Sequence, residues 1–515
     1  MTRKKSHSKS HNKAEVPPPA LGGSPAGAVS QALDRFKALL SREEYAQLLA
    51  ELERPLPQAL RINPLKINPA EAIQAWAERY HWALKPVYYE PAGWQVESSP
   101  GPISQTIEHR LGFYYIQDAA SMLPATLFDL DPARQPLILD MAASPGGKTT
   151  HLASRSGDQG LIIANDASLS RLPALRIVLQ NWSAYHTAIT HYPGEILGDW
   201  LPEKFDCVLL DAPCSMQGLR STESHPMRSI TDNEKLGLAQ RQGRLLQSAF
   251  KAVRPGGQVV YSTCTLTPEE DEAVLDALLA HFPGLAEVED ISRHFPQPVP
   301  ALTSDGGSRQ FDPSVTRAAR LWPHRLGTSG FFAALIRKQG SLDLTRPPFD
   351  QKAKPAPRTT TALTSSQQAE LLSRLSQAYG FDFFQQVEQD GLVLARGPAI
   401  HHTVPIYAQP SSFETHFPGL RVQSLGLLFG EETPDGFVLS HEWATRFGQH
   451  FNAGRYLIAD DQIPAWISGE DLPGLSLPAS PETRIVIVTD APGRNLGRGK
   501  IQRDRLRNLL PKNSL

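Results

Sequence analysis

Residues 137–150 of the chain read LILDMAASPGGKTT. The apolar run Leu137–Leu139 predicts a short buried strand, and Gly146 and Gly147 predict a turn into a helix. A strand, a glycine-rich turn and a helix start together form a binding point at the carboxyl edge of an α/β sheet. Glycines let the backbone approach a ligand closely, and the helix N-terminus offers free N–H groups. The segment therefore predicts a nucleotide-type cofactor site.

The turn by itself fits more than one function. Gly147-Lys148-Thr149 matches the end of a phosphate-binding P-loop, but Ala142 stands where that loop requires its first glycine and Pro145 interrupts it. Asp166, about 20 residues past the turn, is placed to accept hydrogen bonds from ribose hydroxyls, as it would be in an NAD enzyme. A tight turn without a ligand is the third interpretation, and residues further along the chain must decide.

The surrounding pattern predicts the fold class. Short apolar runs alternate with helical segments between residues 112 and 340, which is typical of strands buried on both faces. We expect a doubly wound, Rossmann-like α/β sheet with a small α+β domain before it and a compact α+β or β-barrel module after it. Besides Leu137–Leu139, the expected strands are Leu161–Ala164, Phe205–Leu210, Gln258–Tyr261 and Gly330–Ile336.

Two of these strands end next to a cysteine. Phe205–Leu210 leads through Asp211 to Cys214, and Gln258–Tyr261 leads to Cys264. The carboxyl ends of the strands are where α/β enzymes build their sites. Cys207 lies inside a strand and is expected to be an ordinary buried residue. With three cysteines and no metal-ligand spacing, we expect neither a disulfide framework nor a metal site.

Two thiols at one sheet edge suit the methylation of carbon 5 of cytosine. That carbon is a poor nucleophile, but a thiolate that adds to carbon 6 turns it into an enamine-like carbon able to attack a methyl sulfonium. The adduct must then lose the carbon 5 proton and expel the thiol, and a second group assists that step. A carboxylic acid bound to the cytosine ring nitrogen favours the addition, and Asp211 is the candidate.

The motifs resemble those of the Sun-type, Fmu-like RNA (cytosine-5) methyltransferases. The resemblance rests on Asp140–Thr150, Asp211–Ser215 and Ser262–Leu266, and it extends through 267–272, 322–324 and 330–332. Upstream, 115–118 and 121–122 are similar as well, so that the resemblance covers roughly residues 30–340. The tail segments 496–500 and 506–511 resemble the PUA-like, RNA-binding extension of the bacterial branch that methylates small-subunit ribosomal RNA.

The resemblance implies an S-adenosylmethionine-dependent enzyme and assigns its site. Cys264 is the implied nucleophile, Cys214 assists release, and Asp211 belongs to both the catalytic and the cofactor groups. A bulky residue at Gly146 is expected to block the cofactor. The implied cofactor contacts are Ala142, Ala143, Ser144, Pro145, Gly146, Gly147, Lys148, Asp166 and Asp211.

Two departures from the family pattern stand near this site. Pro193 occupies the position of an acidic residue that normally holds the adenine amino group, which leaves the backbone or Glu195 for that contact. The Pro-Cys-Ser motif normally continues with glycine, whereas Met216 follows here. Both cysteines remain, so the catalytic assignment is kept.

Composition and the resemblance together predict the organisation of the 515 residues. The net charge of −2 makes any basic character local, and Arg494, Arg498, Lys500, Arg503, Arg505, Arg507 and Lys512 form a basic stretch suited to RNA phosphates. No apolar run is long enough for a bilayer and no secretory signal is present, so a location in the cytoplasm is expected. A monomer is expected as well. The expected parts are a disordered basic tail (1–29), an RNA-binding domain (30–111), the methyltransferase domain (112–340), a linker (341–366) and the PUA-like module (367–515).

The leading hypothesis is methyl transfer to structured RNA, with ribosomal RNA or the small ribosomal subunit preferred and transfer RNA open. A P-loop NTPase is the alternative enzyme. A non-catalytic RNA-binding assembly factor is the third hypothesis, supported by Pro193 and opposed by the intact cysteine pair. The target nucleotide is not encoded in any recognisable pattern.

Overall fold

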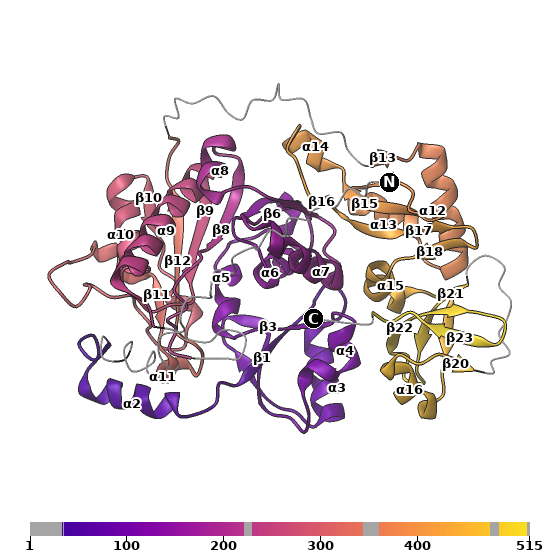
Figure 1. The fold of residues 1–515 in the computed structure, drawn as a ribbon, viewed down its shortest axis with the longest axis horizontal. Coiled ribbons are helices and arrows are strands. Elements are labelled where there is room, and N and C mark those ends of the chain that lie inside the picture. The colour runs from indigo at the N-terminus through magenta and orange to yellow at the C-terminus, as the bar shows by residue number, and fades with distance from the viewer. Residues whose placement is uncertain (1–32, 34–35, 221–228, 343–359, 474–483, 512–515) are drawn as a thin grey trace, which may run out of the picture.

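The computed structural model describes residues 33, 36–220, 229–342, 360–473 and 484–511. The expected disordered tail, most of the expected linker and Lys512 lie outside these residues. Figure 1 shows the described chain as a central sheet flanked by an N-terminal antiparallel sheet and by two C-terminal sheets. The expected α/β class, with its additional N- and C-terminal sheets, is confirmed.

The central sheet has the strand order β10-β12-β9-β8-β5-β6-β7-β16, with β11 paired to β12. The five strands β7, β6, β5, β8 and β9 run parallel, and β12 is antiparallel to β9. The chain moves outward from β5 to β7 and then returns to β8, so the carboxyl ends of β5 and β8 lie at a topological switch point, where ligands bind in open α/β sheets. The strands are β5 (Leu137–Asp140), β6 (Leu161–Asn165), β7 (Thr187–Thr190), β8 (Phe205–Asp211), β9 (Val253–Thr263), β10 (Ala286–Val288), β11 (Ala319–Leu321), β12 (Phe331–Lys338) and β16 (Ser424–Leu425).

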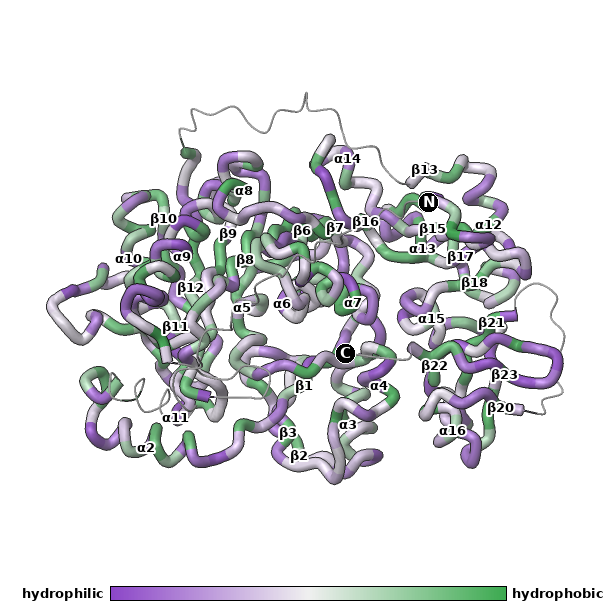
Figure 2. Tube along the Cα trace, viewed as in Figure 1, coloured by the Kyte–Doolittle hydropathy of each residue, from purple (hydrophilic) through white to green (hydrophobic). Residues whose placement is uncertain are grey.

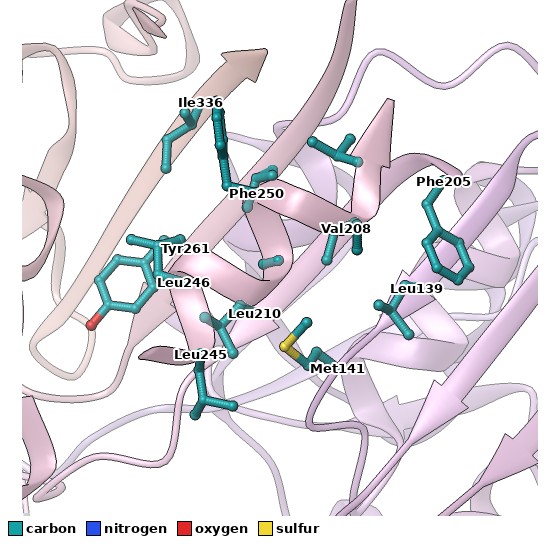
Figure 3. Close-up of a cluster of buried hydrophobic side chains, with 14 of the residues drawn as sticks. Leu139, Met141, Phe205, Val208, Leu210, Leu245, Leu246, Phe250, Tyr261 and Ile336 are labelled. Atoms are coloured by element: carbon teal, nitrogen blue, oxygen red, sulfur yellow. The ribbon is translucent and has the colours of Figure 1, made fainter. Parts of the chain in front are cut away.

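Helices cover both faces of this sheet, which explains why its strands read as continuous apolar runs. One face packs against α5 (Leu123–Thr126), α6 (Gly147–Arg155) and α7 (Leu172–Trp182). The other packs against α8 (Gly194–Trp200), α9 (Asp232–Ala252) and α10 (Glu272–His281). Figure 3 shows this second core gathered between the sheet and α9, and Figure 2 shows the hydrophobic residues concentrated along the central strands.

Four strands of this sheet were not among the expected ones: β7, β10, β11 and β16. β7 is short, and all four of its residues are buried. β16 comes from the C-terminal third of the chain and pairs antiparallel with β7 through Ser424 and Leu425. It covers an edge that would otherwise present unpaired backbone groups.

The N-terminal sheet has the order β2-β3-β1-β4 and is antiparallel. The apolar spacing of residues 32–52 predicts one helix, but the structure interrupts it: Leu33 and Phe36 are helical, and a turn over residues 37–40 separates them from α2. Ser41 caps α2 by accepting a hydrogen bond from the Glu44 backbone, with the Glu44 side chain bonding back, so the regular helix begins at Arg42. The elements are α2 (Arg42–Leu52), β1 (Gln58–Ile62), α3 (Pro69–Tyr80), β2 (Ala83–Val87), β3 (Glu90–Ser98), α4 (Ile107–Arg110) and β4 (Tyr114–Ile116).

The C-terminal part holds two five-stranded sheets, ordered β13-β14-β15-β17-β18 and β19-β21-β22-β23-β20. The sequence of residues 366–379 predicts one helix, and the structure has it as α12 with Thr364 as its cap. The elements are β13 (Thr361–Ala362), α12 (Ser365–Tyr379), α13 (Phe383–Gln389), β14 (Leu392–Arg396), β15 (Val404–Pro410), α14 (Ser412–His416), β17 (Leu427–Thr433), β18 (Gly436–Leu439), α15 (His441–Phe447), β19 (Arg455–Leu457), α16 (Ile463–Ser468), β20 (Leu472–Pro473), β21 (Ile485–Thr489), β22 (Asn495–Ile501) and β23 (Arg505–Asn508).

Buried polar contacts join the C-terminal sheets to the rest of the molecule. Arg446 of α15 donates to Ser183 O and pairs with Asp158 at 2.5 Å, and both side chains of the pair are buried. The buried Lys66 Nζ donates to Leu111 O and to the hydroxyl of Thr445. The N-terminal sheet and the last C-terminal sheet also share one apolar core. Within the described residues, no helix is long and apolar enough to cross a membrane.

Candidate active site

The two cysteines predicted to act together lie side by side. β8 and β9 are parallel neighbours in which Asp211 is opposite Ser262, so the segments that follow them leave the sheet at the same point. The Sγ atoms of Cys214 and Cys264 are 3.0 Å apart. The sequence placed both thiols at this sheet edge, and the strand register brings them into contact.

The surroundings of the two thiols differ. The hydrogen bond with Cys264 and burial raise the pKa of Cys214 well above its ordinary value, and the charge of Glu270 adds to this shift. Cys264 is exposed. Its electrostatic partner is the Lys148 ammonium, whose pKa burial lowers but Asp211 and Cys264 raise, with a net rise. Cys214 is thus held as a thiol, while Cys264 is open to solvent beside a positive charge. Cys207 is buried in β8, as expected.

Asp211 and Lys148 form a polar pair next to the cysteines. Lys148 Nζ lies 2.8 Å from Asp211 Oδ2, and Ser262 Oγ donates to Asp211 Oδ1 at 2.8 Å. The resemblance implied a cofactor contact for Lys148. Its ammonium lies on Asp211, within electrostatic reach of Cys264, so the pair presents an acceptor and a donor beside the Cys264 thiol. The position of Lys148 at the start of α6 gave no signal of this contact.

The glycine-rich turn has the shape of a cofactor cradle. Gly146 has φ 117°, a conformation that side chains other than glycine rarely adopt, and it begins α6 without a side-chain cap. The first N–H groups of the helix are therefore available to an anionic ligand. Asp140 is buried, and its Oδ1 has no hydrogen-bond partner among the described residues. Burial raises the pKa of Asp140 to about 7. An open helix N-terminus and an orphaned carboxylate oxygen fit an amino-acid-bearing cofactor such as S-adenosylmethionine.

A bulky residue at Gly146, expected from the sequence to block the cofactor, would also meet side chains of α7. A Cβ there would lie 3.0 Å from Val178 Cβ and 3.1 Å from Leu175 Cδ1 of α7. Such a substitution would strain the turn and crowd α7, so it would disturb the fold of the turn as well as any ligand.

Asp166 lies where the sequence predicted, just past β6. Its Oδ2 accepts from Ser144 N at 3.1 Å and its Oδ1 from Ser168 N at 2.8 Å, which ties the cofactor turn to the end of β6. Each carboxylate oxygen has a second lone pair, so these bonds leave acceptor capacity for a ribose. Of the other predicted contacts, Ala143 and Ser144 are buried, Ala142 is half-buried and Pro145 is exposed.

Neither departure from the family pattern disrupts the site. Glu195, one candidate for adenine recognition, is held by Arg241 Nε at 3.0 Å, which leaves the backbone beside Pro193 as the other candidate. Met216 has φ 57°, the left-handed conformation that glycine would adopt freely. The loop after Cys214 therefore keeps a glycine-like shape despite the methionine, at a cost of about 1–2 kcal/mol.

The sequence did not predict that α2 contacts the cysteine segments. Leu48 packs with Leu219 and Leu266, which follow Cys214 and Cys264 in the chain. Glu51 of the same helix pairs with Arg220 at 2.8 Å. The N-terminal helix thus braces both segments, a contact between residues too distant in sequence for any local pattern to reveal. No cluster of potential metal ligands occurs in the described part of the chain.

Comparison with known families agrees with this geometry. Residues 127–337 match the family described as 16S rRNA methyltransferase RsmB/F. Residues 30–119 match the N-terminal domain of 16S rRNA methyltransferase RsmF. The ribosomal RNA small subunit methyltransferase F of Aeromonas hydrophila is 32% identical, over 92% of this chain and 94% of that protein. The chain belongs to the RsmB/F family of 16S rRNA methyltransferases. Its activity is that of an RsmF-type 16S rRNA (cytosine-5) methyltransferase, dependent on S-adenosylmethionine.

Further relatives agree with membership of the RsmB/F family. The ribosomal RNA small subunit methyltransferase F of Shewanella woodyi is 32% identical, over 89% of this chain and 90% of that protein. A methyltransferase homologue from Pyrococcus horikoshii is 31% identical with a TM-score of 0.51, and covers 60% of this chain and 99% of its own. NSun6 from the same organism, solved with SFG, shares the fold at 22% identity and a TM-score of 0.50. The P-loop hypothesis is therefore wrong, because the same turn belongs to a methyltransferase sheet.

Proposed function

We propose that this RsmB/F-family enzyme methylates cytosine through a covalent adduct on Cys264. The 3.0 Å separation of Cys264 and Cys214 carries the proposal, because two thiols in contact at a sheet edge fit attack followed by release. The Cys264 sulfur adds to carbon 6, which makes carbon 5 nucleophilic. S-adenosylmethionine, when bound, supplies a methyl group on a sulfonium centre. Once Cys264 is a thioether it no longer shares a hydrogen bond with Cys214, which can then lose its proton to solvent and act as a thiolate. The Cys214 sulfur accepts the carbon 5 proton, the electrons of that C–H bond re-form the double bond between carbons 5 and 6, and Cys264 leaves carbon 6 as a thiolate.

The contrast between the two thiols supports this order of roles. Cys264 is exposed, so a base can reach its sulfur, and the Lys148 ammonium is its charged neighbour. Cys214 is less exposed, and the bond with Cys264, burial and the charge of Glu270 raise its pKa. Asp211 and Lys148 bind the polar edge of the ring from one side. A base bound there faces the Lys148 donor and the Asp211 carboxyl group side by side, and Asp211 favours addition through its bond to the ring nitrogen.

The cofactor is proposed to lie along the turn from Ala142 to Lys148. The N-terminus of α6 suits the carboxylate of the cofactor, and the unpaired Oδ1 of Asp140 suits its amino group. Asp166 accepts from the ribose hydroxyls. Because Glu195 is engaged by Arg241, backbone groups near Pro193 are the proposed adenine contacts.

The proposed division of the chain follows the same logic. Residues 112–340 perform the chemistry, 30–111 and the PUA-like 367–515 hold structured RNA or the small ribosomal subunit, 341–366 connect them, and 1–29 form a basic tail. The enzyme acts as a monomer, since the proposed site is complete within one chain. Its substrate class, 16S rRNA, and its free thiols support a location in the cytoplasm.

A methyl-transfer assay with isotopically labelled S-adenosylmethionine tests the proposal. Purified enzyme is offered small ribosomal subunits, free 16S rRNA and transfer RNA, and the modified position is read by bisulfite sequencing. We expect label at a cytosine of 16S rRNA. Asp166→Asn should raise the KM for the cofactor about 10- to 100-fold, the effect of a lost charged hydrogen bond, with the RNA KM unchanged. Preferred labelling of transfer RNA would redirect the substrate, and no transfer to any RNA would favour an assembly factor.

The basic stretch near the C-terminus is only partly available to RNA, which corrects the sequence-based expectation. Arg498 lies in β22, where its Nη1 donates to Leu439 O and burial lowers its pKa. Arg494 pairs with Asp490 at 2.5 Å. Arg503 and Arg507 are exposed. Removing the C-terminal sheets by truncation near Thr361 would expose the apolar cores that they share with the rest of the molecule. Substitutions at the exposed arginines therefore test RNA binding more cleanly than a truncation does.

Changing Arg503 and Arg507 together to glutamine should flatten the salt dependence of RNA binding. Each lost phosphate contact lowers the slope of log affinity against log salt by about 1. Arg134→Gln serves as control, because the Arg134 side chain is 81% exposed. Arg134 lies before the amino end of β5, at the edge of the central sheet that is opposite the proposed active site. Binding to 16S rRNA is measured across a salt series. An unchanged slope for the double variant would remove these arginines from the RNA contact.

A further inference from the structure

One buried carboxylate lies beneath the cysteine pair and joins the segments that carry it. Glu270 is fully buried and accepts four hydrogen bonds. Ser215 donates to it through its backbone N at 2.9 Å and also through its hydroxyl. Thr267 Oγ1 donates at 2.6 Å and Gln242 Nε2 at 2.9 Å. These donors saturate most of what one carboxylate can accept.

The four donors come from three different parts of the site. Ser215 directly follows Cys214, and Thr267 lies three residues after Cys264. Gln242 of α9 also donates to Pro213 O at 2.9 Å, on the other side of Cys214. The Ser215 and Thr265 hydroxyls are 3.1 Å apart, which closes a second link between the two segments. Glu270 therefore joins the segments that follow both thiols without contacting either sulfur through a hydrogen bond among those of the described residues.

The charge of Glu270 acts on one thiol more than the other. Its carboxylate adds to the rise in the pKa of Cys214, after the bond with Cys264 and burial. The titratable groups that face Cys214 are Cys264, Glu270 and Tyr261, whose own pKa is raised by burial and by nearby carboxylates. Lys148, by contrast, acts on Cys264. The two halves of the pair thus experience charges of opposite sign.

We propose that Glu270 is a positioning residue that holds the Cys214 segment against the Cys264 segment and thereby serves the release step rather than the attack. The proposal rests on the roles given to the cysteines above. An amide in place of the carboxylate keeps the shape but offers one acceptor oxygen and turns an NH₂ group toward donors. It also removes the negative charge beside Cys214. Attack by Cys264 depends on neither feature.

Glu270→Gln is the first test, with methyl transfer to 16S rRNA followed in single turnovers. We expect RNA to become attached to the enzyme at the wild-type rate, while release slows about tenfold and the attached species builds up on denaturing gels. The KM values for RNA and S-adenosylmethionine should stay unchanged, since neither ligand touches Glu270. The pH at which Cys214 is half-alkylated, measured in a Cys264→Ser background to remove the coupled thiol, should move downward.

Ser215→Ala is the matched control, because it removes a donor to Glu270 but keeps the negative charge. It should slow release without lowering the half-alkylation pH of Cys214. If Glu270→Gln fails to fold, Ser215→Ala alone must still show the accumulated adduct, and normal release by it would overturn the proposal. Wild-type release and an unchanged alkylation profile in Glu270→Gln would overturn it as well. By contrast, an active Cys264→Ala enzyme would remove the covalent mechanism itself, which separates the two failures.

Discussion

Cys264→Ala should abolish methyl transfer to 16S rRNA, a loss of roughly 10⁴-fold or more, as expected when a covalent nucleophile is removed. Without this sulfur, no adduct forms at carbon 6 and carbon 5 stays unreactive. Cofactor affinity should be unchanged, because the proposed cofactor contacts lie on the turn after β5. Calorimetry with S-adenosylmethionine checks binding, and incorporation of labelled methyl groups checks turnover.

Cys214→Ala should give a different defect from the same site. Its enzyme can still attack and methylate once, but release is impaired, so RNA should remain attached through Cys264. The bond is a thioether and survives denaturing electrophoresis, because it does not depend on folding. Adding Cys264→Ala to this variant should abolish the attached species.

Cys207→Ala is the matched control for the cysteine pair, because Cys207 is buried in β8 away from the paired thiols. It should neither trap RNA nor lose the methylation step. Trapping by Cys264→Ala rather than Cys214→Ala would reverse the two roles. Activity in both variants, with no trapped RNA, would exclude covalent catalysis by these residues.

Arg320→Met should destabilise the enzyme by about 3–5 kcal/mol, the usual cost of leaving a buried charge unpaired. Arg320 is fully buried in β11, where it bonds Glu272 through Nε at 2.8 Å and pairs with Asp271 at 3.3 Å. Its Nη1 also donates to Leu266 O at 2.9 Å, which anchors the segment after Cys264. The variant therefore loses both the charge balance and the anchor of the segment after Cys264.

Thermal unfolding should show a Tm lower by roughly 6–20 °C for Arg320→Met. Even with Arg320 in place, burial raises the pKa of Asp271 well above its ordinary value. The charge of Arg320 lowers the pKa of Asp271, so without Arg320 the folded state binds the Asp271 proton more tightly still than the unfolded state does. Stability then rises as pH falls toward the folded pKa of Asp271, so the deficit should shrink under acidic conditions.

Arg309→Met is the control for Arg320→Met. Arg309 pairs with Asp276 at 2.8 Å, but its side chain is 47% exposed, so its removal should change Tm little. Equal Tm values for the two variants would contradict the importance of the buried cluster.

The central strands and the cysteine pair were predictable because their signals are local. Strands buried on both faces must be apolar throughout, so an apolar run in the sequence marks nearly the whole strand. The strands β5, β6 and β8 each extend only one residue beyond the predicted run. Parallel strands bring their carboxyl ends to one edge, so residues that follow β8 and β9 had to lie close together. The class of site and the identity of the two thiols followed from these patterns.

Other parts of the site depended on partners that no local pattern specifies. The N-terminal helix was expected in a separate RNA-binding domain, yet Leu48 packs on the segments after both cysteines. Lys148 and Asp211 follow two different strands, and no local pattern indicated that their side chains pair. Arg498 belonged by composition to a basic surface, yet it is buried against Leu439 O.

The sequence by itself determined which strands form the centre of the sheet and that Cys214 and Cys264 follow two of them, because hydrophobic periodicity and strand-end motifs are properties of neighbouring residues. Only the tertiary structure decided how the thiols are spaced, which charge each experiences, and that β16 from the C-terminal part completes the methyltransferase sheet. A two-residue strand has no periodicity of its own, and a buried carboxylate such as Glu270 looks like any helix-flanking acid until its donors converge on it. Contacts of this kind form only when distant segments pack together, because a buried polar group costs free energy unless that packing brings it a hydrogen-bond partner.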